Sequence, residues 1–205
     1  NKISNMCGIT GFISNNHLNK NSMQSIIENM TATLNHRGPD DTGFWYDLES
    51  QIAFGHKRLS ILDLSRAGHQ PMVSSNEKFI IVFNGEIYNH LDLRKEVKDY
   101  VNSKNIKILW NGSSDTETLL TCIEIWGFEH TISKLVGMFS ICLFDKNQRI
   151  IKLARDRIGE KPLYYGYVGN SFVLASELKA IKKFPNFDNQ VNRDALKKYF
   201  KYMYI

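Results

Sequence analysis

Cysteine is scarce in this sequence, and its few cysteines are poorly placed for cross-linking or metal binding. The 205 residues include three, Cys7, Cys122 and Cys142, which cannot form a complete disulfide framework. None has C-x-x-C spacing, so the pattern argues against a redox dithiol or a zinc site, and we expect no metal. Because Cys122 and Cys142 lie in apolar segments, we expect both to be buried as small hydrophobic side chains.

Long hydrophobic runs and strong charge are absent as well. No apolar segment approaches the roughly 20 residues of a transmembrane helix, and no signal-peptide core stands at the start. We therefore expect the reducing cytoplasm and no membrane partner. The formal net charge is a mild +5, and the short lysine clusters at 182–183 and 197–198 lack interleaved arginine and aromatic residues. We expect them to be solvated, with no nucleic-acid partner.

What is present is an ordinary globular composition, 42% hydrophobic and 23% charged, in a length that suits one domain. Apolar spacing predicts helices over residues 22–34, with Ser22 as N-cap, and over 89–101, 115–126 and 193–204. Short apolar runs predict strands over 8–13, 43–46, 52–62, 79–83, 138–144, 150–154, 163–167 and 171–175. Strands at both ends, two hairpin-like spacings and helices between predict an α+β fold with largely antiparallel sheets.

The stretch Met6-Cys7-Gly8 carries the strongest chemical signal because it lies so near the amino terminus. If the chain were cut after Met6, Cys7 would hold a thiol and a free α-amine, with ordinary pKa values of about 8.5 and about 7.7–8.0. The amine can then accept the proton of the thiol, so one residue supplies nucleophile and base. An amide nitrogen cannot do this. Residues 1–6, a leader, propeptide, vector remnant or start upstream of an initiator Met6, must therefore be removed.

Two segments in the first half offer polar side chains that also have an ordinary structural interpretation. Asn84-Gly85 follows an apolar strand and most often means a turn. An amide and a backbone N–H side by side can instead form an oxyanion hole. Arg58, in a strand-like run, is either solvated or a bidentate clamp for a carboxylate. Its neighbour His56 is more often structural than catalytic.

Two later segments have the same ambiguity. Asp115 stands at a helix start, where an acid complements the dipole, yet Asp115 or Glu86 can also hold a substrate ammonium. The charged segment 154–165 is either a local salt-bridge network or a docking surface. Taken together, these segments supply a thiol, an oxyanion donor pair, a carboxylate clamp and an acid. That set is what is needed to hold a free α-amino acid and attack its side-chain carbonyl.

Six motifs, in order and at family-like spacing between Cys7 and about residue 180, carry a family resemblance. The motifs are Met-Cys-Gly-Ile, His-Arg-Gly-Pro-Asp at 36–40, Gly-His-Lys-Arg-Leu-Ser-Ile at 55–61, Asn-Gly-Glu-Ile-Tyr-Asn-His at 84–90, Ser-Asp-Thr-Glu at 114–117 and Arg-Asp-Arg-Ile-Gly-Glu-Lys-Pro-Leu-Tyr-Tyr at 155–165. With them the sequence resembles the glutaminase domain of glutamine-hydrolysing asparagine synthetase, a class II glutamine amidotransferase of the N-terminal-nucleophile hydrolase superfamily.

The resemblance implies a fold and a reaction. The fold is a four-layer αββα sandwich with two stacked antiparallel sheets. In the reaction, Cys7 attacks the side-chain amide of L-glutamine, a γ-glutamyl thioester forms, ammonia leaves and water releases glutamate. The matching residues take roles by the same resemblance: Asn84 and Gly85 as the oxyanion hole, Arg58 for the α-carboxylate, Glu86 and Asp115 for the α-ammonium, and the backbone along Arg58, Leu59, Ser60, Ile61 and Leu62 as pocket wall.

The resemblance also implies an arrangement of domains and partners. We expect the amidotransferase domain over residues 7–190, and over 191–205 the start of a linker or helix toward a C-terminal synthetase domain missing from this sequence. ATP and magnesium are expected in that missing domain, and no cofactor in this one. L-glutamine and the synthetase domain are the expected partners, with a homodimer left open.

Two alternatives remain open at this stage. The first is a non-catalytic amidotransferase-like module in which Cys7 stays blocked, although the intact set of Arg58, Asn84, Gly85 and Asp115 argues against it. The second is a glutaminase domain that serves another acceptor, such as a surface-sugar or secondary-metabolite carboxylate. Only the missing half of the protein would separate that acceptor from the aspartate used in asparagine synthesis.

Overall fold

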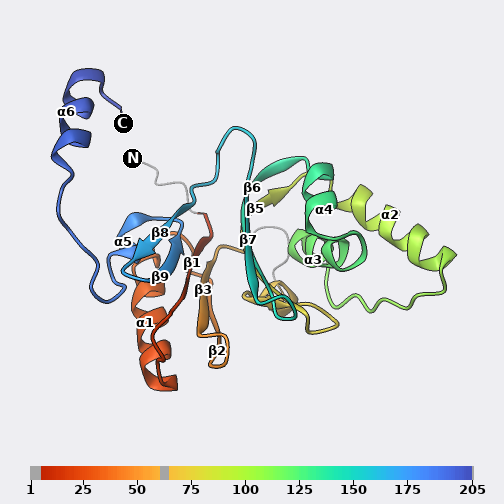
Figure 1. Cartoon of the computed structure of the whole chain (residues 1–205). Coiled ribbons are helices and arrows are strands. Elements are labelled where there is room, and N and C mark those ends of the chain that lie inside the picture. Colours follow the sequence, from red (N-terminus) through yellow and green to blue (C-terminus); the bar gives the residue numbers. More distant parts are fainter. Residues whose placement is uncertain (1–5, 61–64, 205) are drawn as a thin grey trace.

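Two antiparallel sheets lie face to face in the computed structural model, which describes residues 6–60 and 65–204 (Figure 1). Sheet A has the order β2 (Asp41–Asp47), β3 (Ile52–Arg58), β1 (Gly8–Ile13), β9 (Ser171–Ala175) and β8 (Tyr164–Val168). Sheet B has the order β4 (Met72–Val73), β5 (Phe79–Ile87), β6 (Gly137–Asp145) and β7 (Ile150–Arg155). The antiparallel sheets predicted from the strand spacing are confirmed.

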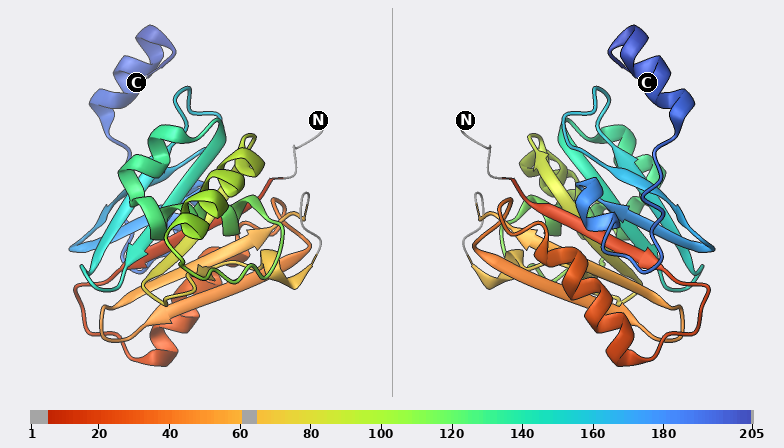
Figure 2. Two further views of the ribbon diagram at one scale, coloured as in Figure 1. Left: turned by 90° about the vertical axis from the view of Figure 1, so that its right-hand side faces the viewer. Right: turned by 90° about the vertical axis from the view of Figure 1, so that its left-hand side faces the viewer.

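Helices cover the outer face of each sheet. α1 (Lys20–Ala32) and α5 (Leu178–Ile181) pack on sheet A. α2 (His90–Ser103), α3 (Asp115–Trp126) and α4 (Phe128–Lys134) lie on the side of sheet B. A 3-10 turn spans Arg66–Gly68. α6 (Arg193–Tyr202) has no buried residue and projects from the body in both views of Figure 2. The layers are thus helix, sheet, sheet, helix, as the αββα expectation required.

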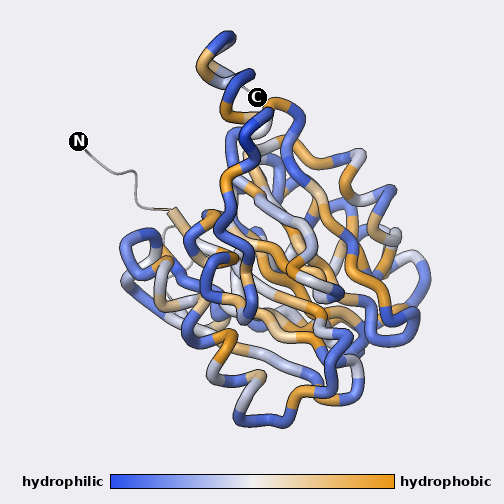
Figure 3. Tube along the Cα trace, turned by 60° about the vertical axis from the view of Figure 1, so that its left-hand side comes forward, coloured by the Kyte–Doolittle hydropathy of each residue, from blue (hydrophilic) through white to orange (hydrophobic). Residues whose placement is uncertain are grey.

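Three apolar clusters hold these layers together, and β5 shows why a strand can serve two of them. Its Ile80 and Val82 join the cluster between the sheets, whereas Ile81 and Phe83 join the cluster under α2 and α3. Successive side chains on a strand point to opposite faces, so a continuous apolar run is buried on both sides. Figure 3 shows the hydrophobic stretches gathered in the interior of the body.

Most predicted elements form, and several differ in extent. β1, α3 and β9 have the predicted bounds, and the two predicted hairpins join β6 to β7 and β8 to β9. The strand predicted over 52–62 was too long, because β3 ends at Arg58. Asn19, whose side chain accepts from the Ser22 N–H, is the N-cap of α1, so the assignment of Ser22 was wrong. β4, α4 and α5 were not predicted.

The most consequential correction concerns Asn84-Gly85. The pair is neither a turn nor a strand end, because β5 continues to Ile87, which pairs with Gly137 of β6. A Cβ on residue 85 would collide with the carbonyl oxygen of Met138. Glycine is therefore needed here for a close approach of two strands, not for the bend that Asn-Gly usually signals.

Two further features are the burial of the other two cysteines and the lengths of the helices. Cys122 and Cys142 are both fully buried within apolar clusters, as predicted. Within residues 6–60 and 65–204, no helix is both long enough and apolar enough to cross a bilayer.

Candidate active site

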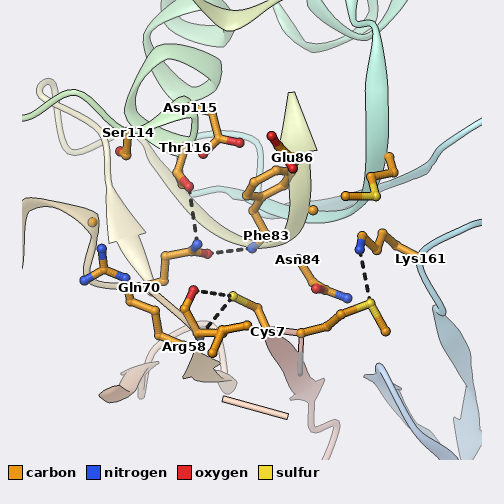
Figure 4. A pocket seen from close by; sticks show the side chains of 15 residues that line it. Cys7, Arg58, Gln70, Phe83, Asn84, Glu86, Ser114, Asp115, Thr116 and Lys161 are labelled. Carbon is orange, nitrogen blue, oxygen red and sulfur yellow. Dashed lines mark hydrogen bonds between the residues drawn. The ribbon is translucent and has the colours of Figure 1, made fainter. Parts of the chain in front are cut away.

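One pocket gathers side chains from both sheets and from the start of α3 (Figure 4). Cys7 directly precedes β1, and Arg58 is the last residue of β3. The antiparallel register, with Gly8 opposite Lys57, brings them to the same end of these two neighbouring strands. Asn84, Gly85 and Glu86 come from the far end of β5, and Asp115 is the first residue of α3. Residues more than 100 positions apart in sequence therefore line one space.

The Cys7 thiol lies against the backbone of Leu59. The Leu59 N–H donates to Cys7 Sγ at 3.3 Å, and the Leu59 carbonyl oxygen lies 3.6 Å from the same sulfur. Burial raises the pKa of the Cys7 thiol, although the Leu59 contact and the positive charge of Arg58 oppose that rise. A thiol with a raised pKa is protonated at neutral pH, so it needs a base before it can act as a nucleophile.

Asn84 brings a side-chain amide to the same pocket as Cys7. The side chain is 1% exposed, and its Nδ2 has no hydrogen-bond partner among the residues that the structure describes. A buried amide N–H without a partner is costly, and native proteins rarely leave one. The arrangement therefore suits an acceptor atom that enters the pocket, such as a carbonyl oxygen that gains negative charge.

The backbone N–H of Gly85 leaves β5 on the edge away from β6, as two neighbouring N–H groups show. The N–H groups of Phe83 and Ile87 both leave the strand on the edge away from β6, where they donate to Gln70 Oε1 at 2.6 Å and Asp115 Oδ2 at 3.0 Å. Backbone N–H groups of a strand alternate between its two edges, so the N–H of Gly85, midway between these residues, faces this edge as well. Asn84 and Gly85 both line the pocket that Cys7 also lines.

Charges of both signs lie across the pocket from each other. Arg58 is buried, its Nη1 donates to the Ser65 carbonyl oxygen at 2.8 Å, and Gly68 packs against its guanidinium. Asp115 and Glu86 lie on the opposite wall in Figure 4. Burial raises the pKa of the Asp115 carboxyl, and the hydrogen bond from the Ile87 N–H opposes that rise. A cation facing two acids matches the carboxylate and ammonium of a free amino acid.

Three predicted pocket residues beyond Leu59 have different outcomes. Ser60 turns toward the His-Arg-Gly-Pro-Asp segment, where its N–H donates to Asp40 Oδ2 at 2.8 Å. Ile61 and Leu62 lie outside the described residues. Of the described residues 58–60, Arg58 and Leu59 line the pocket.

The His-Arg-Gly-Pro-Asp segment at 36–40, one of the six family motifs, holds the backbone of Cys7 in place. Arg37 Nε donates to the Cys7 carbonyl oxygen at 2.9 Å, and Arg37 Nη1 donates to Glu177 at 3.0 Å. Burial favours a higher pKa for Glu177, but hydrogen bonds from Lys179, Arg37 and His36 outweigh it and lower that pKa to about 2. Gly38 lies so close to the backbone of Arg58 that a Cβ would collide with it.

Sequence reasoning missed several residues of the pocket wall. Gln70 joins two elements, because its Oε1 accepts from Phe83 N–H and its Nε2 donates to Thr116 Oγ1 at 3.4 Å. No local pattern marks Gln70, so nothing in the sequence pointed to it. Lys161, in contrast, lies in a segment that the sequence did single out. Also on the wall are Met6, Gly68, Ser114 and Met138.

The charged segment after β7 is not a salt-bridge network. Within the described ranges, its charged side chains form no ion pair. Two of them bond to backbone groups: Arg155 to the carbonyls of Gly159 and Lys161, and Asp156 to three N–H groups. His56 is structural, as predicted: it is fully buried, and its Nε2 lies 3.2 Å from the Phe83 carbonyl oxygen. No group of three His, Cys, Asp or Glu side chains able to hold a metal occurs among the residues placed.

Comparisons with known proteins give a consistent result. The model of the glutamine amidotransferase domain family matches residues 6–205. A putative glutamine-hydrolysing asparagine synthetase 2 of Methanocaldococcus jannaschii is 37% identical over 95% of this chain and 39% of its own length. Asparagine synthetase 3 of Bacillus subtilis is 37% identical over 95% of this chain and 30% of its own length. The chain thus spans well under half of these relatives.

A solved structure agrees with the fold. Glutamine phosphoribosylpyrophosphate amidotransferase from B. subtilis superposes with a TM-score of 0.69 at 21% identity, covering 87% of this chain and 43% of that one. At this identity the likeness concerns the fold alone, and it agrees with the sandwich of two antiparallel sheets described above.

Proposed function

The chain belongs to the glutamine amidotransferase domain family, and on that premise we propose that it hydrolyses L-glutamine to glutamate and ammonia through a Cys7 thioester. One observation carries the proposal. The Cys7 thiol, an unpartnered amide donor on Asn84, the guanidinium of Arg58 and the carboxylate of Asp115 line a single pocket. Such a set binds an amino acid at its α-substituents and leaves its side-chain carbonyl at the sulfur.

The charges orient the substrate. Arg58 binds the α-carboxylate, which suits a guanidinium held by the Ser65 carbonyl oxygen. Asp115 and Glu86, on the facing wall, bind the α-ammonium. The side chain of glutamine then extends past Leu59 toward Cys7 and Asn84, so the pocket selects an amino acid by both of its α-charges.

The reaction proceeds in two halves. The Cys7 α-amine takes the thiol proton, and the sulfur attacks the amide carbon of glutamine. The resulting oxyanion accepts hydrogen bonds from Asn84 Nδ2 and the Gly85 N–H. The protonated amine then gives its proton to the leaving nitrogen, ammonia departs and the γ-glutamyl thioester remains. Water attacks the thioester with the same amine as base, glutamate leaves and the thiol is restored.

This mechanism requires the Met6–Cys7 bond to be cut. In the uncut chain the nitrogen of Cys7 is an amide, which has no basicity at neutral pH. Because burial raises the pKa of the thiol, little thiolate forms without that base. The uncut chain is therefore inactive, and the chain that begins at Cys7 is the enzyme.

We further propose that the ammonia serves a synthetase domain in a longer protein. The two relatives above are named as glutamine-hydrolysing asparagine synthetases, and the chain spans 39% and 30% of their lengths. Asparagine formed with ATP and magnesium in the additional domain is the corresponding reaction here. The domain that the structure describes contributes the ammonia.

The test combines the amino-terminal residue of the mature protein, read by mass spectrometry, with a glutaminase assay. We expect a chain beginning at Cys7 to release one glutamate and one ammonia per glutamine, and to form a γ-glutamyl thioester, detected by its added mass, only while the Cys7 thiol is free. Hydrolysis by a chain that still begins at Asn1 overturns the amine as base. A homogeneous Cys7-initiated chain without activity overturns the enzyme and supports a binding module.

A further inference from the structure

Lys161 is a buried cation of the pocket wall that the proposed mechanism does not use. Only 6% of the residue is exposed, and among residues 6–60 and 65–204 no carboxylate lies within ion-pair distance of its Nζ. A buried lysine ammonium without a counter-ion is rare and unfavourable. Such a charge is typical of a functional site.

The loop that carries Lys161 is rigidly braced. The Asp156 carboxylate accepts from the N–H groups of Phe139 at 3.2 Å, Glu160 at 2.8 Å and Lys161 at 3.0 Å. Arg155 holds the other side of the loop by donating to the Gly159 and Lys161 carbonyl oxygens, each at 2.6 Å. These bonds hold the backbone of Lys161 near Phe139 of β6, and its side chain lies on the pocket wall.

The side chain of Lys161 reaches the residue before Cys7. Lys161 Nζ lies 3.1 Å from Met6 Sδ, and Figure 4 places Lys161 on the other side of Cys7 from Arg58. Arg58 and Lys161 thus lie at different ends of the pocket, and Lys161 contacts the side chain of the residue whose removal would free Cys7. Loss of Met6 removes the thioether contact and leaves the ammonium beside the new amino terminus.

We infer that Lys161 is a positioning residue for the Cys7 α-amine, whose nearby positive charge favours the unprotonated form of the amine that acts as base. The inference rests on the proposed function. Two like charges in a partly desolvated space disfavour each other, so an ammonium close to the amine opposes its protonation. Burial lowers the pKa of Lys161 and the charge of Arg37 adds to that effect, whereas Glu160, Cys7 and Glu86 oppose it.

The pH profile of kcat/KM for glutamine, measured on the chain that begins at Cys7, tests this role. On its acidic side, kcat/KM falls as the base becomes protonated, and we call this fall the acidic limb. In the native protein we expect its midpoint below about pH 7.7, the ordinary pKa of a terminal amine. K161M keeps the length of the side chain without its charge, and should move this limb upward by about one pH unit. Activity then falls about tenfold on the acidic side and is nearly unchanged on the alkaline plateau. K161R should restore the native limb.

A matched control removes a lysine charge elsewhere. Lys152, on β7, pairs with Glu129 outside the pocket, so K152M should leave the profile unmoved. An acidic limb at or above 8 in the native enzyme overturns the inference, even if K161M fails to fold. So does a uniform loss in K161M at every pH, the result of a merely structural lysine. A Cys7-initiated native chain with no glutaminase activity, in contrast, overturns the proposed function itself.

Discussion

The pocket end of the sandwich and the core between its sheets each contain a cysteine, and the comparison separates burial from reactivity. Cys142 lies on β6 in the apolar cluster between the sheets, where burial raises its pKa well above the ordinary value. Burial also raises the pKa of Cys7, but there the Leu59 contact and Arg58 oppose it. Both thiols are protonated at rest. Only Cys7 has donors, charges and a potential base around it, so its surroundings make it a nucleophile.

The strongest way to break this comparison is to remove each thiol in turn. C7A should lower glutaminase kcat by on the order of 10⁶, the scale found when a hydrolase loses its nucleophile. C142A should retain the activity and lose about 1 kcal/mol of stability, because a small cavity opens in the core. The measurements are ammonia release and urea unfolding of the Cys7-initiated chain. Equal activity losses in both variants would refute the assignment.

Removal of the Asn84 amide should have the next largest effect on catalysis. N84A should reduce kcat by about 10²–10³ with little change in KM, because the amide serves the transition state. Since Asn84 Nδ2 has no partner in the described structure, its loss breaks no internal hydrogen bond and the unfolding midpoint should hardly move. Steady-state kinetics and thermal unfolding decide the matter. A large drop in thermal midpoint with unchanged kcat would make Asn84 a structural residue.

The substrate clamp gives a smaller effect of a different kind. R58K keeps the charge but loses the planar fork, so we expect KM for glutamine to rise about tenfold to 100-fold. K57M, next in sequence, is the matched control because Lys57 does not line the pocket. Glutamine titrations of both variants give the comparison. If R58K leaves KM unaltered and lowers kcat alone, Arg58 does not bind the α-carboxylate.

A buried group of sheet A is expected to respond to pH through stability rather than through catalysis. Burial lowers the pKa of His56 to about 3, against 6.5 in the unfolded chain. Below pH 6.5 the unfolded state binds a proton that the native state cannot, so stability falls as pH drops from 6.5 toward 3. Between pH 6.5 and 5 this loss is about 2 kcal/mol. Urea unfolding at these pH values should show this loss of stability in the native chain and not in H56Q. If the free energy of unfolding falls equally with pH in both proteins, the prediction is wrong.

The elements were accessible from sequence because local patterns determine them. Ile80 to Phe83 form a run of apolar residues without a polar break, and both faces of β5 are buried. Ser114 precedes Asp115 and Glu117, and α3 begins there with the Ser114 side chain accepting from the Glu117 N–H. At one position the prediction failed because a pairing between distant residues overrides the local signal. Asn84-Gly85 would form a turn by itself, but β6 holds it in a strand.

The sequence allowed most residues of the candidate site to be identified, but it did not give their arrangement in space. Cys7, Arg58, Asn84 and Asp115 were chosen by their residue types and family motifs, and all four line the pocket. Gln70 escaped because its role is to join Phe83 to Thr116, a connection that exists only after β5 and α3 have packed. Lys161 was visible as a charge in a charged loop, yet its direction depended on Asp156 and Arg155.

The sequence by itself determined which groups are available: one thiol next to a strand start, an amide and a glycine, a guanidinium and two acids. Their types and the alternation of apolar residues are local properties, which the order of amino acids sets directly. Tertiary structure alone decided the edge of β5 that the Gly85 N–H faces, the burial that raises the pKa of Cys7, and the approach of Lys161 to Met6. These depend on strand register and on contacts between residues up to 155 positions apart, which no local pattern encodes.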